Sequence, residues 1–189
     1  MALITYIGID PGATGGIAIL CGSAVQVHTM PHSEKSIYDL IHTHASPPGK
    51  CIAGIEQVSG FIGEAHPGSA MFSFGENYGF LRACLISCGL TPSKGDPELS
   101  TFVSVPPQRW QSGIVVPSKN SSTAPYSITP RAKGEPKTEW KNRLKWNAQQ
   151  LYPKKRYPRL TITLRTADAL LIATYLKQQY TTLLRRKGC

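Results

Sequence analysis

Acidic residues are scarce in this sequence, and three of them border long apolar runs. Asp and Glu together number 11 among 189 residues. Asp10 ends an apolar run just before a glycine-rich turn, Glu56 ends a second run, and Asp168 stands at the start of a third. An ionised carboxylate beside buried residues is unfavourable unless a cation compensates it, and Mg²⁺ favours such hard oxygen ligands. The three acids are therefore candidate metal ligands.

Three carboxylates in one site would support phosphodiester hydrolysis. They repel one another unless metal ions bind between them. Two Mg²⁺ ions about 4 Å apart can activate a water and stabilise the leaving oxygen. Asp10, Glu56 and Asp168 would then be catalytic residues as well as ligands. Each also has an ordinary alternative, because an acid can simply begin a turn or cap a helix.

The turn after Asp10 is open to a second interpretation. Gly12, Gly15 and Gly16 would let the backbone approach a phosphate closely. Actin-like kinases begin with a strand, an Asp and a glycine-rich hairpin that holds ATP phosphates. Such a phosphotransferase would also need a second phosphate-binding hairpin and an adenosine loop, and the sequence shows neither. The metal-site interpretation is therefore favoured.

Strands must bring these acids to one place. Short apolar runs bounded by turn residues predict five strands, of which the first three are joined by tight turns and are antiparallel. The predicted strands span residues 3–9, 16–21, 24–29, 51–55 and 101–105. If the first and fourth strands are neighbours, Asp10 and Glu56 meet at the same edge of the sheet.

Helices are predicted where apolar residues recur at helical spacing. They span residues 33–45, 68–88, 136–151 and 166–184. Asp168 falls in the first turn of the last helix, where the helix dipole favours a carboxylate. Gly75 and Gly79 form a small-residue stripe on the second helix, suited to close approach by the sheet or by another subunit. The expected fold class is α/β, a mixed five-stranded sheet flanked by helices.

Length and composition predict a single domain over residues 1–189, large enough to bury its own core. Residues 116–135, rich in Ser, Thr, Pro and Lys, are expected to form a flexible basic insertion. No apolar run is long enough for a membrane span, and no signal-like start is present. The five cysteines include no CxxC pair. We therefore expect an intracellular protein of a reducing compartment, without a membrane partner.

Basic residues are concentrated in one part of the chain. Twelve Lys or Arg and only two Glu lie between residues 119 and 165, so this segment carries the whole net charge of +10. Such a block indicates a polyanionic partner, since a merely solubilising surface usually mixes both signs. The candidate phosphate-binding residues are Arg131, Lys133, Lys137, Lys141, Lys145, Lys154, Lys155 and Arg156. Phe61, between glycines in the linker after Glu56, is a candidate for stacking on unpaired bases or for packing on the core.

The motifs resemble, in their order, the RuvC-type Holliday junction resolvases of the RNase H-like fold, most closely the phage and plastid (MOC1-like) branch. The resemblance spans nearly the whole chain and rests on residues 7–12, 55–58, 74–75 with Gly79, 105–106 with Trp110, and 167–173. It implies a homodimer that nicks two opposed strands of branched DNA, a four-way junction. It also implies that Asp10, Glu56 and Asp168 bind two Mg²⁺ or Mn²⁺ ions per active site, with no small-molecule cofactor.

The sequence departs from this family just before the last acid. Relatives usually have an Asp or His three or four residues earlier, where this chain has Arg165 and Leu164. Arg165 could bind the scissile phosphate and stabilise its developing charge. It could instead weaken binding of the second metal ion and leave a protein that binds branched DNA without cleaving it. We expect catalysis to be retained.

Overall fold

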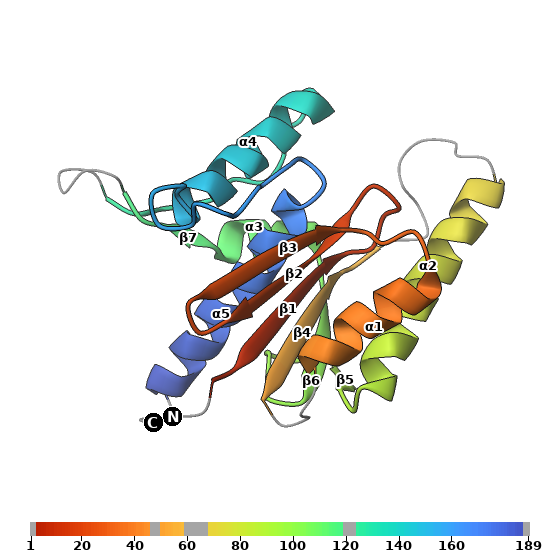
Figure 1. Cartoon of the computed structure of the whole chain (residues 1–189). Coiled ribbons are helices and arrows are strands. Elements are labelled where there is room, and N and C mark those ends of the chain that lie inside the picture. Colours follow the sequence, from red (N-terminus) through yellow and green to blue (C-terminus); the bar gives the residue numbers. More distant parts are fainter. Residues whose placement is uncertain (1–2, 46–49, 59–67, 119–123, 187–189) are drawn as a thin grey trace.

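The computed structural model describes residues 3–45, 50–58, 68–118 and 124–186. Its main sheet has six strands in the order β3-β2-β1-β4-β6-β5 (Figure 1). They are β1 (Thr5–Asp10), β2 (Gly16–Cys21), β3 (Ala24–Thr29), β4 (Cys51–Glu56), β5 (Thr91–Ser93) and β6 (Thr101–Val105). The first three strands pair antiparallel, and the remaining pairings are parallel. The predicted mixed α/β fold is confirmed, with one strand more than expected.

The additional strand, β5, carries almost no sequence signal. It has three residues, with Pro92 in the middle, and it lies at the edge of the sheet beside β6. Because proline cannot donate a hydrogen bond to the ladder, it is tolerated mainly at such edges. A three-residue segment without alternating apolar residues falls below what periodicity can detect.

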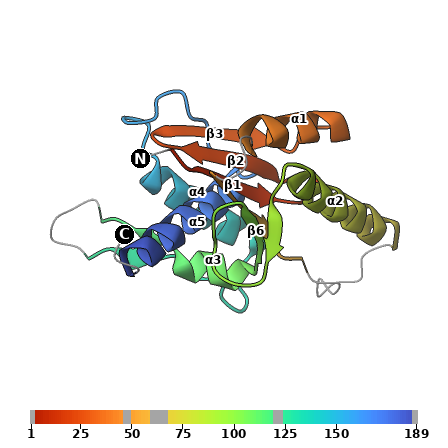
Figure 2. The same ribbon diagram turned by 90° about the horizontal axis from the view of Figure 1, so that it is seen from below.

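Helices cover both faces of the sheet. They are α1 (Glu34–Ala45), α2 (Gly68–Ser87), α3 (Pro107–Gly113), α4 (Lys137–Leu151) and α5 (Ala167–Arg186). Alternating residues of β1 divide the core: Ile7 and Ile9 pack with α1 and α2, whereas Tyr6 packs on the side of α5. Figures 1 and 2 show α1 and α2 on one side of the sheet and α5 on the other. Helix α4 packs on α5.

Helix α5 lies unusually close to β1. A Cβ atom on Gly8 would overlap the carbonyl oxygen of Ala169 and the amide nitrogen of Ala173. Only glycine therefore permits this approach, because the opposing atoms are backbone and cannot rotate away. The contact places the first turn of α5, which carries Asp168, against the strand that ends at Asp10.

Part of the segment expected to be a flexible insertion forms secondary structure. Strands β7 (Val115–Val116) and β8 (Tyr126–Ser127) pair antiparallel, and Val116 and Ile128 are buried. The Arg143 guanidinium of α4 donates hydrogen bonds to the Thr129 carbonyl and to Glu135. Two-residue strands and long-range side-chain contacts leave no periodic pattern in a polar sequence.

No helix within the described ranges is both long and apolar enough to cross a bilayer.

Candidate functional site

Asp10 and Glu56 end two neighbouring parallel strands. In the pairing of β1 with β4, Ile9 is opposite Ile55, so the next residue of each strand is one of the two acids. Parallel strands present their carboxyl ends at the same edge of a sheet. The structure therefore brings these two carboxylates to one edge, as the proposed strand order requires.

Asp168 reaches the same edge from α5. Its side chain is only 1% exposed. The Oδ2 atom accepts a hydrogen bond from Lys141, whereas Oδ1 is buried without a partner among the described residues. A buried carboxylate oxygen without a hydrogen bond is costly and usually indicates a role in binding.

Protein groups also engage one oxygen of each of the other two acids. The Gly12 amide donates to Asp10 Oδ1 at 3.4 Å, and the Trp110 indole Nε1 donates to Glu56 Oε1 at 3.2 Å. Trp110 is fully buried in α3. A Cβ atom on Gly15 would lie 2.7 Å from Asp10 Cγ, so the hairpin also packs tightly on this carboxylate. These contacts fix the orientation of both acids.

The electrostatics show a site that is short of positive charge. Burial, and then the charges of Asp10 and Asp168, raise the pKa of Glu56 to about 8. Burial and the neighbouring Asp168 raise the pKa of Asp10 to about 6. Burial also raises the pKa of Asp168, although Lys141 opposes the change. Mutual repulsion in a dry site is the arrangement that a bound cation would relieve.

Lys141 lies in this acidic site, and the sequence did not reveal that location. Its spacing in the sequence placed it in a basic row on α4, together with Lys137 and Lys145. In the structure its ammonium pairs with Asp168 and lies 5.1 Å from the centre of the Trp140 ring. Burial opposes its charge, but the three acids together hold the pKa of Lys141 above its ordinary value. The only local signal is its position next to Trp140, which is four residues before Leu144 and therefore on the same face of the predicted helix.

A cavity of about 310 Å³ opens beside Asp10. Its lining includes three of the basic residues predicted from the sequence, namely Lys137, Lys141 and Arg165. Arg165 is exposed. The cavity therefore combines one of the acids with side chains that attract phosphate.

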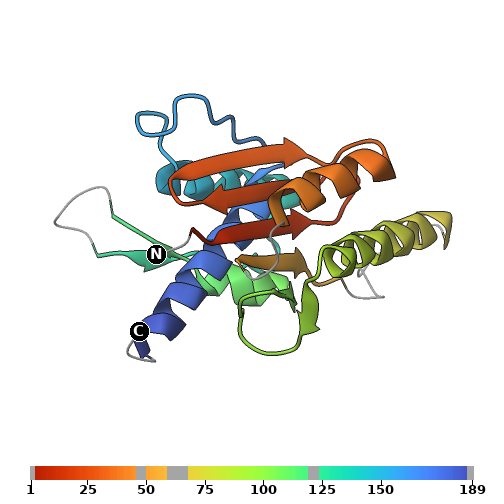
Figure 3. The same ribbon diagram turned by 60° about the horizontal axis from the view of Figure 1, so that its bottom comes forward.

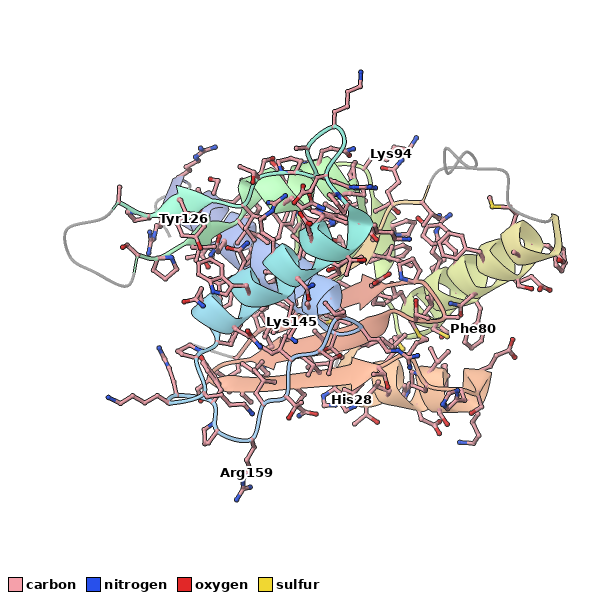
Figure 4. All side chains as sticks on the ribbon, turned by 90° about the horizontal axis from the view of Figure 1, so that it is seen from above. His28, Phe80, Lys94, Tyr126, Lys145 and Arg159 are labelled. Atoms are coloured by element: carbon pink, nitrogen blue, oxygen red, sulfur yellow. The ribbon has the colours of Figure 1, made fainter. Side chains whose placement is uncertain are left out.

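The other predicted DNA-binding residues lie outside this cavity. They are Arg131, Lys133, Lys145, Lys154, Lys155 and Arg156. Figure 4 shows Lys145 on α4 and Arg159 projecting from the connection between α4 and α5. Arg131 donates a hydrogen bond to the Glu135 carbonyl, and Arg156 lies over the Tyr157 ring. Phe61 lies outside the described residues.

The donor set suits a divalent cation, although the ligands do not converge fully. Among residues 3–45, 50–58, 68–118 and 124–186, no group of three or more His, Cys, Asp or Glu is arranged to hold a metal ion. The three acids nevertheless supply hard oxygen donors, and Asp168 Oδ1 is buried without a partner among these residues. The three side chains fit a Mg²⁺ or Mn²⁺ ion in their chemistry, with Lys141 competing for Asp168.

Comparison with known proteins identifies the fold. No protein-family model and no curated protein sequence matches this chain. Among solved structures, it is similar to T. thermophilus RuvC in complex with a Holliday junction substrate, with a TM-score of 0.51 and 13% sequence identity. The match covers 95% of this chain and 96% of that one. The chain therefore has a RuvC-like fold.

Proposed function

We propose that this protein is a metal-dependent, structure-selective DNA endonuclease that resolves four-way (Holliday) junctions by paired nicks. The observation that carries this function is the gathering of Asp10, Glu56 and Asp168 at one edge of a RuvC-like sheet. Their coupled charges, beside a cavity lined by basic residues, suit a metal ion and a phosphodiester. T. thermophilus RuvC, whose structure was solved with a Holliday junction, supports the choice of substrate.

The proposed reaction is hydrolysis of a phosphodiester. A water oxygen bonds to phosphorus, one phosphorus–oxygen bond breaks, and the departing oxygen takes up a proton. Divalent metal, when bound, supplies activation of the water and stabilisation of the developing charge. Asp10, Glu56 and Asp168 would hold it, and Trp110 orients Glu56 by its indole N–H. The position of Arg165 on the cavity lining suits contact with the scissile phosphate.

Basic residues outside the cavity would hold the junction arms. Most of them are exposed and lie on the connection that follows α4 or on the loop before it. Phosphate contacts of this kind provide affinity and salt dependence but little sequence information. This distribution favours recognition of DNA shape over recognition of base sequence.

Paired nicks require two active sites, which a homodimer would supply. The amino-terminal half of α2 projects beyond the sheet (Figure 3). Phe72 on this half is 67% exposed, and a Cβ atom on Gly75 or Gly79 would have no neighbour within 4 Å among the described residues. The small-residue stripe therefore does not face the sheet, and we propose that it faces the second subunit.

The deciding experiment is incubation of the purified protein with a labelled four-way junction and Mg²⁺ or Mn²⁺. We expect symmetric nicks in two opposed strands. A shifted but intact junction in both metals would exclude the nuclease.

That negative outcome would support a second candidate, a branched-DNA-binding protein that does not cleave. The ion pair between Lys141 and Asp168 favours this candidate, because it engages one of the three acids. The actin-like phosphotransferase has no comparable support. In the hairpin after Asp10, Gly15 packs on the Asp10 carboxylate, and the chain then continues directly into β2.

A further inference from the structure

Lys141 is a largely buried cation inside the acidic site. Its side chain is 26% exposed, and that of its partner Asp168 is 1% exposed. Helix α4 positions it by packing on α5, and the ammonium lies over the Trp140 ring. A buried ammonium is tolerated only where an opposite charge or hydrogen bonds compensate it. The ion pair is therefore part of the construction of the site and not a surface contact.

The oxygens of the three acids are divided between the protein and the remaining space. One oxygen each of Asp10, Glu56 and Asp168 accepts a hydrogen bond from Gly12, Trp110 and Lys141 respectively. Asp168 Oδ1 is buried and has no partner among the described residues. One oxygen of each acid thus already binds a group of the protein, and Asp168 Oδ1 is available to an ion.

The charge balance points to a single ion. The three acids carry three negative charges when ionised, and Lys141 carries one positive charge. One divalent ion would neutralise the remaining two negative charges. A second divalent ion would leave two excess positive charges in a largely buried site, which is strongly unfavourable at low dielectric constant.

We propose that Lys141 supplies the second positive charge of the active site, so that each chain binds one divalent ion and not two. This inference rests on the proposed nuclease function. Lys141 acts by its charge, and it lines the same cavity as Asp10 and Arg165, where a phosphate would enter.

The test is Mn²⁺ titration of the full chain, with free Mn²⁺ counted by electron paramagnetic resonance. We expect one bound Mn²⁺ ion per chain in the unmodified protein and no bound Mn²⁺ in Asp10→Asn. Lys141→Gln removes the charge and frees Asp168, so it should bind a second ion, with the first bound about tenfold or more tighter. Lys145→Gln, a neighbouring lysine on α4 without an acidic partner in the described structure, should still bind one.

Lys141→Arg provides a second variant in case the neutral one fails to fold. It keeps the positive charge and should bind one ion. Two ions in the unmodified protein, two in Lys141→Arg, or unchanged binding in a folded Lys141→Gln would each overturn the inference.

Junction cleavage by the same preparations separates this inference from the proposed function. One bound ion without cleavage would leave the role of Lys141 standing and exclude the nuclease. Two bound ions with cleavage would support the nuclease and overturn the role of Lys141. Absence of Mn²⁺ binding in the unmodified protein would overturn both the metal site and the role of Lys141.

Discussion

Individual side chains at the sheet edge are held in an unfavourable state that a metal ion would relieve. Glu56 and Asp10 have raised pKa values because they are buried and close to other acids. Hydrogen bonds from Trp110 and Gly12 orient these carboxylates but do not neutralise them. Functional sites often retain such groups at a cost in stability, because the same features create binding capacity.

Asp10→Asn should abolish cleavage while leaving junction binding intact. The substitution removes a ligand charge but keeps the shape, so cleavage should fall by orders of magnitude. The measurement pairs a nicking assay with a gel-shift titration. Glu98→Gln removes an exposed acid elsewhere and should behave as the unmodified protein. Full cleavage by Asp10→Asn would place the active site elsewhere.

Metal affinity should rise as the pH is raised from 6 to 8. The acids must lose their protons to bind a cation, and the pKa values of Asp10 and Glu56 are raised to about 6 and about 8. Without metal, the stability of the folded protein should change in the opposite direction. Folding favours the protonated forms of Asp10 and Glu56, because their pKa values are raised. Their contribution to stability is therefore lost as the pH rises through those values. Calorimetric Mn²⁺ titrations at several pH values test the first trend, and a constant affinity would contradict it.

Among the secondary structure elements, the contact of α5 with β1 does most to build the site. It brings Asp168 to the strand that carries Asp10, and it depends on glycine at position 8. Gly54 on the neighbouring strand β4 also lies close to α5, but there it faces a side chain. A Cβ atom on Gly54 would lie 3.0 Å from a methyl group at the end of the Leu176 side chain.

Gly8→Ala should therefore destabilise the protein more than Gly54→Ala. At position 8 the opposing atoms are backbone, so α5 must move, at a cost of about 3 kcal/mol or more. At position 54 a leucine side chain can adjust, and a cost of about 1 kcal/mol is expected. Urea unfolding of both variants measures the difference. Equal stabilities would show that α5 does not approach β1 as closely as described.

For the whole molecule, the positive charge and the exposed face of α2 are the features that concern assembly on DNA. The site itself is acidic, whereas the basic segment of residues 119–165 carries the full net charge of +10. Long-range attraction of this kind raises association rates and weakens as salt screens it.

Junction affinity should fall steeply with salt, and the slope should depend on the exposed basic cluster after α4. Replacing Lys154, Lys155 and Arg156 together by Gln should lower the slope of log affinity against log salt by up to about 0.9 for each phosphate that is no longer neutralised. Fluorescence anisotropy over a range of salt concentrations measures this slope. An unchanged slope would remove this cluster from the DNA interface.

Phe72→Glu should convert the proposed homodimer into monomers. A charge on the most exposed aromatic residue of α2 would be buried without a partner in the interface. Light scattering after size-exclusion chromatography measures the mass, and Val115→Glu, which alters an exposed apolar residue outside α2, serves as the control. A dimer that survives Phe72→Glu would require a different interface.

Much of the framework could be read from local sequence patterns. The strands that end at Asp10 and Glu56, and the helix that carries Asp168 in its first turn, are predictable because apolar periodicity and turn residues act over a few positions. The RuvC-like fold followed from the order of these motifs. The three-residue β5 was missed because so short an edge strand carries no periodic pattern.

The partners of individual side chains required the folded chain. Lys141 looked like one more lysine in a basic row, yet it pairs with Asp168, 27 residues away in sequence. Trp110 is a fully buried aromatic residue, and its indole also orients Glu56. These contacts depend on how α4 packs on α5 and on where α3 follows β6. Sequence periodicity specifies which face of a helix is buried, whereas the neighbour across that face is set by long-range packing.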